Sequence, residues 1–369
     1  MDSRIMEPIV DYEQNGLHFG AHSELENCTC RIVHDDMNLF NAIFIIGFLP
    51  ILSILGLVAN AINMYIYSKT SSSAERYLMA LSISDFGVCA SGILVITSDS
   101  VRAHSFFIDQ LFTLLLPKLI PFGLFFQMCS IYITVTAALD CFVKVSSCFV
   151  TRSRNYCTVS NANKILVGVF FCTAVYNIIQ FAELEAVKCF SHEMGIEIYE
   201  LCPTSLRLDE TYITFYRGYL YAITMAFLPF FILTVLTSFI IWELNRRKAC
   251  KILNRTVETF HDYVVISEQV ENNKPVEADT SSPFVLVMVV LLFLGCSFVS
   301  LLVNILEMTG GSLSHDIQMA LIDVGNFLVV FNATANIFIY VCSNAYFRNQ
   351  VFELFGIHKP PEKMQQTQL

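Results

Sequence analysis

The sequence has little charge for its length. Asp, Glu, Lys and Arg make up only 15% of its 369 residues, whereas an ordinary soluble domain carries about 25%. The 22 Lys and Arg are outnumbered by 32 Asp and Glu, which gives a formal net charge of -10. Nucleic acid is disfavoured as a partner because phosphate contacts need clustered cations. The mean hydropathy of +0.58 further disfavours a soluble two-domain enzyme.

The short motifs that indicate catalysis or metal binding are also missing. The sequence contains no Cys-x-x-Cys, no His-Glu-x-x-His and no glycine-rich phosphate loop, and its 8 His include no His-Glu pair with metal spacing. We therefore expect no enzyme and no metal centre built on His or Cys. Residues 1–36 lack the apolar stretch of a signal peptide, so the first apolar span is expected to direct membrane insertion.

Long apolar windows, by contrast, are abundant. A membrane helix needs about 20 apolar residues to cross a hydrocarbon core of about 30 Å. Seven windows of this kind, two of them interrupted by a single Asp, are present: Met37–Ser68, Tyr77–Ile96, Leu119–Leu139, Ile165–Ala182, Gly218–Trp242, Thr280–Leu306 and Ile317–Val341. They predict an all-α membrane protein, a bundle of seven transmembrane helices.

The loop charges predict the orientation. Cytoplasmic loops are rich in Lys and Arg, and 15 of the 22 cations fall on the side that carries the carboxyl terminus. We therefore expect an extracellular tail over 1–38, the bundle over 39–343 and a cytoplasmic helix with a tail over 344–369, in the plasma membrane. About 19 of the 32 acids fall outside, so the outer face is acidic and should attract cationic ligands.

Three features fit this topology. Asn27 begins an Asn-Cys-Thr glycosylation sequence on the expected outside. Four Cys lie there too, where disulfides are permitted, and three pairings of Cys28, Cys30, Cys189 and Cys202 stay open. The apolar spacing within 344–355 predicts an amphipathic helix on the inner leaflet, with membrane lipid as its partner.

Polar residues inside the spans are costly in lipid and therefore indicate function. Asp85 lies in the middle of the second span, and polar residues at comparable depth occur on three other spans: Asn60, Ser130, Asn332 and Asn336. Two interpretations stay open. The group either holds a small hydrated cation, with sodium as the expected ion, or forms a structural hydrogen-bond cluster between helices.

These residues carry a family resemblance. Asn60 after Gly-Leu-Val-Ala, Leu81 with Asp85, Pro229 in the fifth span and Asn-Ile-Phe-Ile-Tyr over 336–340 resemble rhodopsin-like G-protein-coupled receptors. Longer stretches, such as 201–207 and 323–332, resemble nematode FMRFamide-type neuropeptide receptors. The resemblance implies a receptor for an extracellular neuropeptide, signalling through a heterotrimeric G protein. The alternative is a non-signalling decoy or scaffold with the same architecture.

The switch positions of the family depart from its pattern. Asp140-Cys141-Phe142 stands where the family has Asp-Arg-Tyr, so the arginine that latches the third helix to the sixth is missing. Ile337 replaces the proline before Tyr340, and Leu116 replaces the outer cysteine of the third span. Asp140 and Lys144 are spaced to form an i,i+4 ion pair. The resemblance thus predicts altered, constitutive or lost coupling.

The resemblance also implies a ligand site. A peptide ending in Arg-Phe-amide carries a cation and an aromatic ring, which suit carboxylates and aromatic walls. The expected ligand-binding residues lie in or at the outer halves of the spans: Glu183, Glu307, Asp323, Phe126, Tyr216 and Phe298. For each of them a plain packing or solvent-facing role is the alternative.

Overall fold

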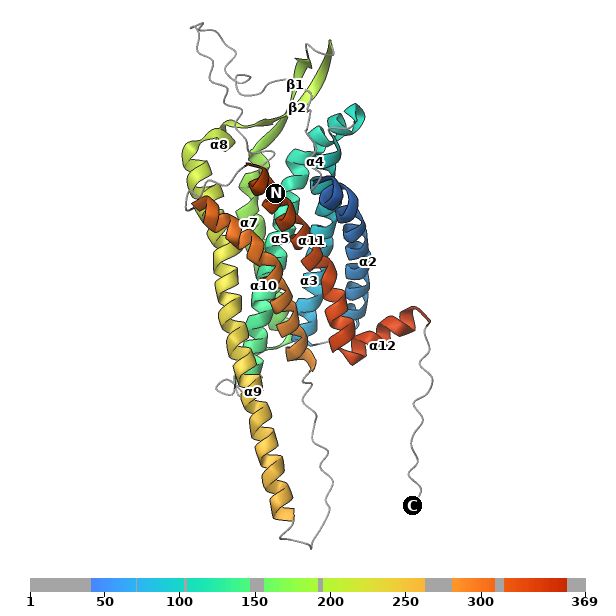
Figure 1. The fold of residues 1–369 in the computed structure, drawn as a ribbon, viewed down its shortest axis with the longest axis vertical. Coiled ribbons are helices and arrows are strands. Elements are labelled where there is room, and N and C mark those ends of the chain that lie inside the picture. The colour runs from blue at the N-terminus through green and yellow to red at the C-terminus, as the bar shows by residue number, and fades with distance from the viewer. Residues whose placement is uncertain are drawn as a thin grey trace.

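The computed structural model describes residues 41–70, 72–102, 105–146, 156–191, 195–262, 281–308 and 315–356. Within these ranges, seven helices are long and apolar enough to cross a membrane, and they pack as one bundle (Figure 1). The spans are Ala42–Ser68, Ser73–Thr97, Phe106–Val145, Val159–Ala182, Tyr212–Arg247, Pro283–Leu302 and Met319–Ser343. The predicted seven-helix bundle is confirmed.

Several spans combine α-helix with short π-helical or 3₁₀ segments. In chain order the spans are built from η1 (Ala42–Phe48) and α2 (Leu49–Ser68); α3 (Ser73–Ser91) and η2 (Gly92–Thr97), followed by α4 (Ser98–Val101); α5 (Phe106–Val145); α7 (Val159–Asn177) and η5 (Ile178–Ala182); η6 (Tyr212–Leu220), η7 (Ile223–Phe227) and α9 (Leu228–Asp262); α10 (Ser281–Met308); and α11 (His315–Ser343). The π-helical segments lie in the first, second and fifth spans, and such wider turns often mark functional sites.

Polar side chains begin several helices. Ser72 and Glu75 form a reciprocal capping box at the start of α3, and the Thr158 side chain accepts the backbone N–H of Asn161 at the start of α7. The short helix α12 (Ala345–Leu354) follows the seventh span, and its first turn is capped by Asn344. These contacts satisfy backbone N–H groups that have no partner within the helix. The helix expected over 344–355 therefore forms.

A β-hairpin follows the fourth span and was not predicted. Strands β1 (Leu184–Ser191) and β2 (Ile196–Pro203) pair antiparallel, and Gly195 in the turn has φ +67°, a backbone conformation that favours glycine. The short helix α8 (Ser205–Leu208) leads from β2 to the fifth span. The hairpin lies at the end of the bundle opposite α12 (Figure 1), and we call these two ends the hairpin end and the α12 end.

The third span is longer than predicted. Helix α5 has 40 residues, so it is about 60 Å long at 1.5 Å per residue, twice the hydrocarbon core. The predicted start at Leu119 is wrong by 13 residues, because α5 begins at Phe106. Its first turns carry Gln110, whose side chain donates to the Tyr199 carbonyl at 3.1 Å and accepts the Tyr199 N–H at 2.7 Å. The start of α5 is thereby bound to β2.

At some positions in the bundle a glycine leaves room for a side chain of a neighbouring helix. A Cβ built on Gly87 of α3 would lie 2.2 Å from the Phe126 ring of α5. The main apolar core lies toward the α12 end, where the fully buried rings of Tyr67, Tyr340 and Phe347 meet. This packing brings α2, α11 and α12 into contact and positions the polar residues described next.

Candidate ligand cavity and polar core

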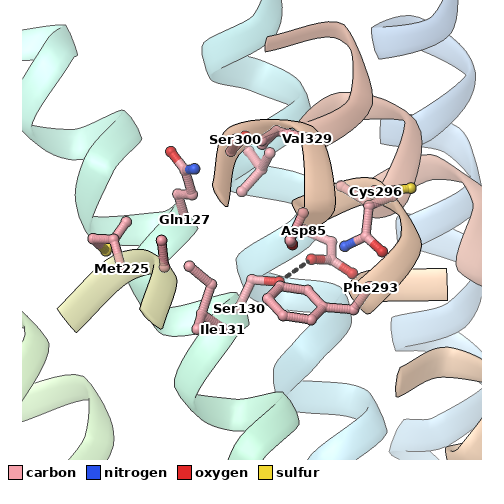
Figure 2. Close-up of a pocket in the computed structure, with 14 residues that line it drawn as sticks. Asp85, Gln127, Ser130, Ile131, Met225, Phe293, Cys296, Ser300 and Val329 are labelled. Carbon is pink, nitrogen blue, oxygen red and sulfur yellow. Dashed lines mark hydrogen bonds between the residues drawn. The ribbon is translucent and has the colours of Figure 1, made fainter. Parts of the chain in front are cut away.

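Asp85 is the centre of a hydrogen-bonded cluster inside the bundle. Its side chain on α3 is 1% exposed. Ser130 Oγ of α5 donates to one carboxylate oxygen at 2.6 Å, and Asn336 Nδ2 of α11 donates to the other at 2.8 Å. Figure 2 shows Ser130 pointing to Asp85 across the cavity wall. Three of the five residues expected in the polar core therefore meet directly.

The other two members lie beside this contact. Asn60 of α2 donates to the Gly56 carbonyl at 3.0 Å and to the Ala333 carbonyl at 2.9 Å, so it joins the first and seventh spans. Asn332 of α11 lines the same cavity as Asp85. Within the described part of the chain, the Oδ1 atoms of Asn332 and Asn336 are buried without a hydrogen-bond partner. The cluster therefore has acceptor oxygens that protein donors do not use.

The cavity beside Asp85 is small. Its volume is about 60 Å³, and its walls come from α3, α5, η7, α10 and α11. Its polar lining consists of Asp85, Gln127, Ser130, Ser297, Ser300 and Asn332. A space of this size holds an ion or a few waters, but it cannot enclose a peptide side chain and its neighbours. A larger ligand must therefore contact the bundle nearer one of its ends.

Glu183, expected to bind ligand, is engaged by side chains of this chain. It follows the fourth span and is 4% exposed. Arg207 Nη1 and Arg217 Nη2 lie 3.2 and 3.4 Å from its Oε2, and the Tyr212 hydroxyl donates to its Oε1 at 2.5 Å. Burial raises the pKa of the Glu183 carboxyl, while the Tyr212 hydrogen bond and the Arg207 charge oppose this shift. The cluster joins the fourth span, α8 and the fifth span.

An aromatic stack continues from this cluster. The Tyr216 ring stacks on Tyr212 at 5.0 Å and on Tyr176 at 5.4 Å between centroids. The Tyr216 hydroxyl donates to the Tyr176 carbonyl at 2.5 Å, and Tyr176 shares a hydrogen bond with Thr224 at 3.0 Å. Tyr216 therefore packs between the fourth and fifth spans at their hairpin ends.

The remaining predicted ligand residues are scattered. Asp323 of α11 is 9% exposed and accepts a hydrogen bond from Asn41 Nδ2 at 2.9 Å. Phe126 faces Gly87 of the second span. Phe298 is 55% exposed, on a face of α10 away from Cys296, Ser297 and Ser300, which line the cavity. Glu307 is part of α10, but its side chain lies outside the described residues. Of the five whose side chains the structure describes, Glu183 and Tyr216 are joined through Tyr212, and Asp323, Phe126 and Phe298 make their contacts elsewhere.

Two of the switch positions, Cys141 and Tyr340, lie toward the α12 end. Cys141 is buried in the main core. Tyr340 is fully buried, and its ring meets Tyr67 edge to face at 5.4 Å. Pro229 is the second residue of α9, directly after the π-helical segment η7, so its missing N–H falls where the hydrogen-bond pattern already changes.

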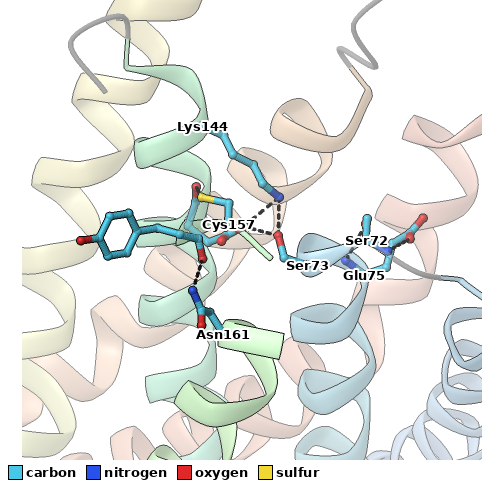
Figure 3. A network of polar contacts seen from close by, with 8 residues as sticks. Ser72, Ser73, Glu75, Lys144, Cys157 and Asn161 are labelled. Carbon is cyan, nitrogen blue, oxygen red and sulfur yellow. Dashed lines mark hydrogen bonds and ion pairs between the residues drawn. The ribbon is translucent and has the colours of Figure 1, made fainter. Parts of the chain in front are cut away.

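The expected Asp140–Lys144 ion pair is present, with Lys144 Nζ 2.9 Å from Asp140 Oδ2. Ser73 at the start of α3 joins it, because Ser73 Oγ donates to Asp140 Oδ2 at 3.0 Å and lies 2.6 Å from Lys144 Nζ. Figure 3 shows Ser73 and Lys144 meeting in this network. The Asp140 side chain is only 9% exposed, so the pair is more buried than a surface pair and links the second and third spans.

A second link at this end was missed by sequence reasoning. Arg247 of α9 donates through Nη2 to the Val145 carbonyl at the end of α5. Glu243, 7% exposed, pairs with Arg246 at 2.9 Å and with Arg247 at 3.3 Å. The only signal in the sequence was the Glu-x-x-Arg-Arg spacing, which predicts pairs along one helix but not a contact with another helix.

The hairpin cysteines narrow the open pairings. Cys189 and Cys202 are both disulfide-bonded, but Cys189 lies opposite Ile198 and Cys202 opposite Glu185. This register separates them by four rungs, or about 13 Å at 3.3 Å per residue, beyond the reach of a disulfide. They are therefore not bonded to each other. Cys28, Cys30 and Asn27 lie outside the described residues.

The fold and the buried polar core together define the class of protein. The family model for the seven-transmembrane receptors of the rhodopsin family matches residues 27–340. The chain therefore belongs to the rhodopsin family of seven-transmembrane receptors.

Individual relatives resemble it over most of its length. It is 30% identical over 335 residues to the probable G-protein coupled receptor frpr-1 of Caenorhabditis elegans, an alignment covering 86% of this chain and 80% of that one. It is 25% identical over 311 residues to the FMRFamide receptor of Drosophila melanogaster, covering 83% of this chain and 52% of that receptor. The FMRFamide peptide receptor frpr-18 of C. elegans is 25% identical over 196 residues, which are 52% of this chain and 44% of that receptor.

Proposed function

We propose that this chain is a plasma-membrane receptor for an FMRFamide-like neuropeptide and signals through a heterotrimeric G protein. The observation that carries the proposal is the match to the rhodopsin family over residues 27–340, together with relatives that are named as FMRFamide receptors. We further propose that the receptor lies in the membrane with its hairpin end outside the cell and its α12 end in the cytoplasm. The excess of Lys and Arg in the loops at the α12 end supports this orientation.

The peptide enters from the hairpin end. Asp323 is our first candidate for its cation, because this carboxylate lies two turns of α11 before Val329, which lines the central cavity. Glu183 is a weaker candidate, since a ligand cation would compete with Arg207 and Arg217 for the same oxygen. Glu307 stays a candidate from its place near the end of α10. We propose three aromatic residues as contacts for the aromatic ring of the peptide: Tyr216, Phe126 and Phe298.

A sodium ion fits the polar core. The donor set beside the cavity consists of the Asp85 carboxylate, the Ser130 hydroxyl and the Asn332 amide oxygen, and hard cations prefer oxygen ligands. The buried Oδ1 of Asn332, which has no hydrogen-bond partner among the described residues, supports this assignment. If the ion binds, sodium chloride should raise the melting temperature of the purified receptor relative to choline chloride. Asp85→Asn should abolish that difference, and an equal shift in both proteins would refute the site.

The residues at the inner end of the bundle, where a G protein would couple, differ from those of the family. Cys141 replaces the family's arginine, and two other links hold the inner ends of the spans. One joins Asp140 and Lys144 to Ser73, and the other joins Arg247 to Val145. We propose that these links restrain the inner end in place of the missing arginine.

The direct test is a signalling assay with defined peptides. Cells expressing a surface-tagged receptor and a panel of G proteins are treated with Arg-Phe-amide peptides and with the same peptides as free acids. We expect a second-messenger response to at least one amidated peptide, and a reduced response for Asp323→Asn at equal surface expression. Surface-expressed receptor that neither binds nor answers any amidated peptide would overturn the proposal. Binding without a response would refute the coupling alone.

A further inference from the structure

A second, larger cavity lies at the α12 end, away from the polar core. Its volume is about 710 Å³, and its walls come mainly from the last turns of α5 and the first turns of α7, with Tyr77 of α3 and with Tyr156 and Cys157 before α7. Leu139, Val143 and Ile165 form its apolar side, and Tyr156, Asn161 and Lys164 lie at its polar side. None of the residues proposed to bind peptide or sodium lines it. Of the switch residues, only Asp140 does.

The cavity opens on the outside of the bundle. Leu139 is 42% exposed, Ile165 is 44% exposed and Tyr156 is 55% exposed. Exposed apolar side chains are ordinary on a helix that faces lipid, so exposure alone carries no argument. This surface differs from an ordinary lipid-facing surface in two ways: it contains a cavity, and Lys164 lies at the polar side of that cavity. Lys164 is exposed and forms no ion pair with any residue in the described part of the chain.

The polar and apolar sides follow the depth of the membrane. Asn161 and Lys164 lie in the first two turns of α7, which begins at Val159, where a membrane helix enters the headgroup layer. From Val143 back to Thr136, the lining of α5 runs about 10 Å deeper at 1.5 Å per residue. A ligand that fits must therefore carry a polar head at one end and a hydrocarbon portion of at least this length.

The charged side chains at the cavity determine which sign of charge the ligand's polar head should carry. Asp140 is the one carboxylate in the lining, but Lys144 lies 2.9 Å from it and neutralises it. Figure 3 shows Lys144 and Asn161 on either side of Cys157 in this network. Lys164 is then the charge that a ligand meets, so an anionic head is favoured. The cytoplasmic leaflet is the one rich in anionic lipid.

We propose that this cavity between α5 and α7 binds an anionic phospholipid of the inner leaflet, with its phosphate at Lys164 and one acyl chain along Leu139, Val143 and Ile165. A sterol would fill the apolar part but would leave Lys164 without a counter-charge. The assignment of the leaflet rests on the proposed orientation. The binding itself does not depend on any peptide or G protein, so it can fail or succeed independently of the proposed function.

The test is native mass spectrometry of the purified full-length receptor with equal amounts of phosphatidylserine and phosphatidylcholine. We expect the wild type to retain phosphatidylserine several-fold better. Lys164→Gln should reduce this ratio to near one. Lys118→Gln is the matched control, because Lys118 is another exposed lysine of a membrane helix but lies outside the cavity lining, and it should leave the ratio unchanged.

A second variant tests the acyl-chain side. Ile165→Trp should reduce retention of both phospholipids by filling the apolar part, whatever the headgroup. The proposal is overturned if Lys164→Gln keeps the wild-type ratio, or if Lys118→Gln lowers the ratio as much as Lys164→Gln does. It is also overturned if, when an equal amount of cholesterol is added to the mixture, Ile165→Trp displaces the cholesterol and neither phospholipid. Each of these readings can be taken on receptor that shows an unchanged melting profile.

Discussion

The guanidinium of Arg247 donates a hydrogen bond to the backbone carbonyl of Val145 and so binds the fifth helix to the last residue of the third. A carbonyl at a helix C-terminus has no partner within the helix and carries partial negative charge, so a guanidinium is a favourable donor to it. Glu243 pairs with the same arginine on its own helix at 3.3 Å. In a chain with Cys141 in place of the family's arginine, this contact supplies a link between the third and fifth helices at the α12 end.

Breaking this link should raise basal signalling. We expect Arg247→Ala to increase second-messenger output without peptide several-fold, because the third and fifth helices lose a shared hydrogen bond in the resting arrangement. Output should be measured at matched surface expression. Arg246→Ala is the control, since Arg246 pairs with the same Glu243 but its guanidinium lies over the Trp242 ring, and it should change output little. Equal effects of the two variants would count against a specific role for Arg247.

Removing the Glu183 carboxylate should destabilise the receptor. Two buried guanidiniums share this group, and loss of one partner of a buried ion pair costs roughly 3–5 kcal/mol. We expect Glu183→Gln to lower the melting temperature and the surface level, whereas Glu185→Gln, at an exposed position on β1, should alter neither. Adding Arg207→Gln to Glu183→Gln should cost less than the sum of the single effects. Strict additivity would show that the pair is not coupled.

The hairpin should respond to pH near neutrality. Burial raises the pKa of Glu200 on β2 to about 7, with Asp109 adding to the rise and Arg102 opposing it. Because the folded-state pKa lies above the ordinary value of 4.5, this group's contribution to stability is complete below pH 4.5 and is lost as the pH rises to 7. The melting temperature should therefore fall between pH 5 and 7 and then level off. Glu200→Gln should flatten that part of the profile, and an unchanged slope would refute the assignment.

Disulfide mapping should separate the two hairpin cysteines. Both are bonded, and the strand register keeps them apart, so a non-reducing digest should contain no peptide pair that joins Cys189 to Cys202. Among the pairings open from the sequence, Cys28 and Cys30 stay as the expected partners. Recovery of a Cys189–Cys202 linkage would mean that the register of the hairpin is different from the one described.

The spans and the polar core were predictable because lipid imposes a strong and simple rule. Charged side chains are excluded from about 20 consecutive residues, so Asp85 was conspicuous, and its contacts with Ser130 and Asn336 followed from matching depths. The start of α5 was not predictable in this way. Beyond the membrane, hydropathy sets no limit on a helix, and Asp109 and Lys118 could lie in a helix or in a loop equally well.

The buried arginines were missed for a related reason. By position in the sequence, Arg207 and Arg217 fall among the charges of the outer face, yet both side chains are less than 10% exposed because Glu183 pairs with them. A long-range ion pair depends on how α8 folds back onto the fifth span, and a single sequence does not contain that distance. The sequence position of Arg247 likewise predicts a charge in a loop, although the side chain reaches another helix.

The paired hydrogen bonds between Gln110 and Tyr199 give the long third helix a mechanical consequence. The Gln110 side chain bonds both the N–H and the carbonyl of Tyr199. A tilt of α5 would therefore move the hairpin with it. Conversely, displacement of the hairpin by a bound molecule would move α5, whose other end, at Val145, lies at the opposite membrane surface.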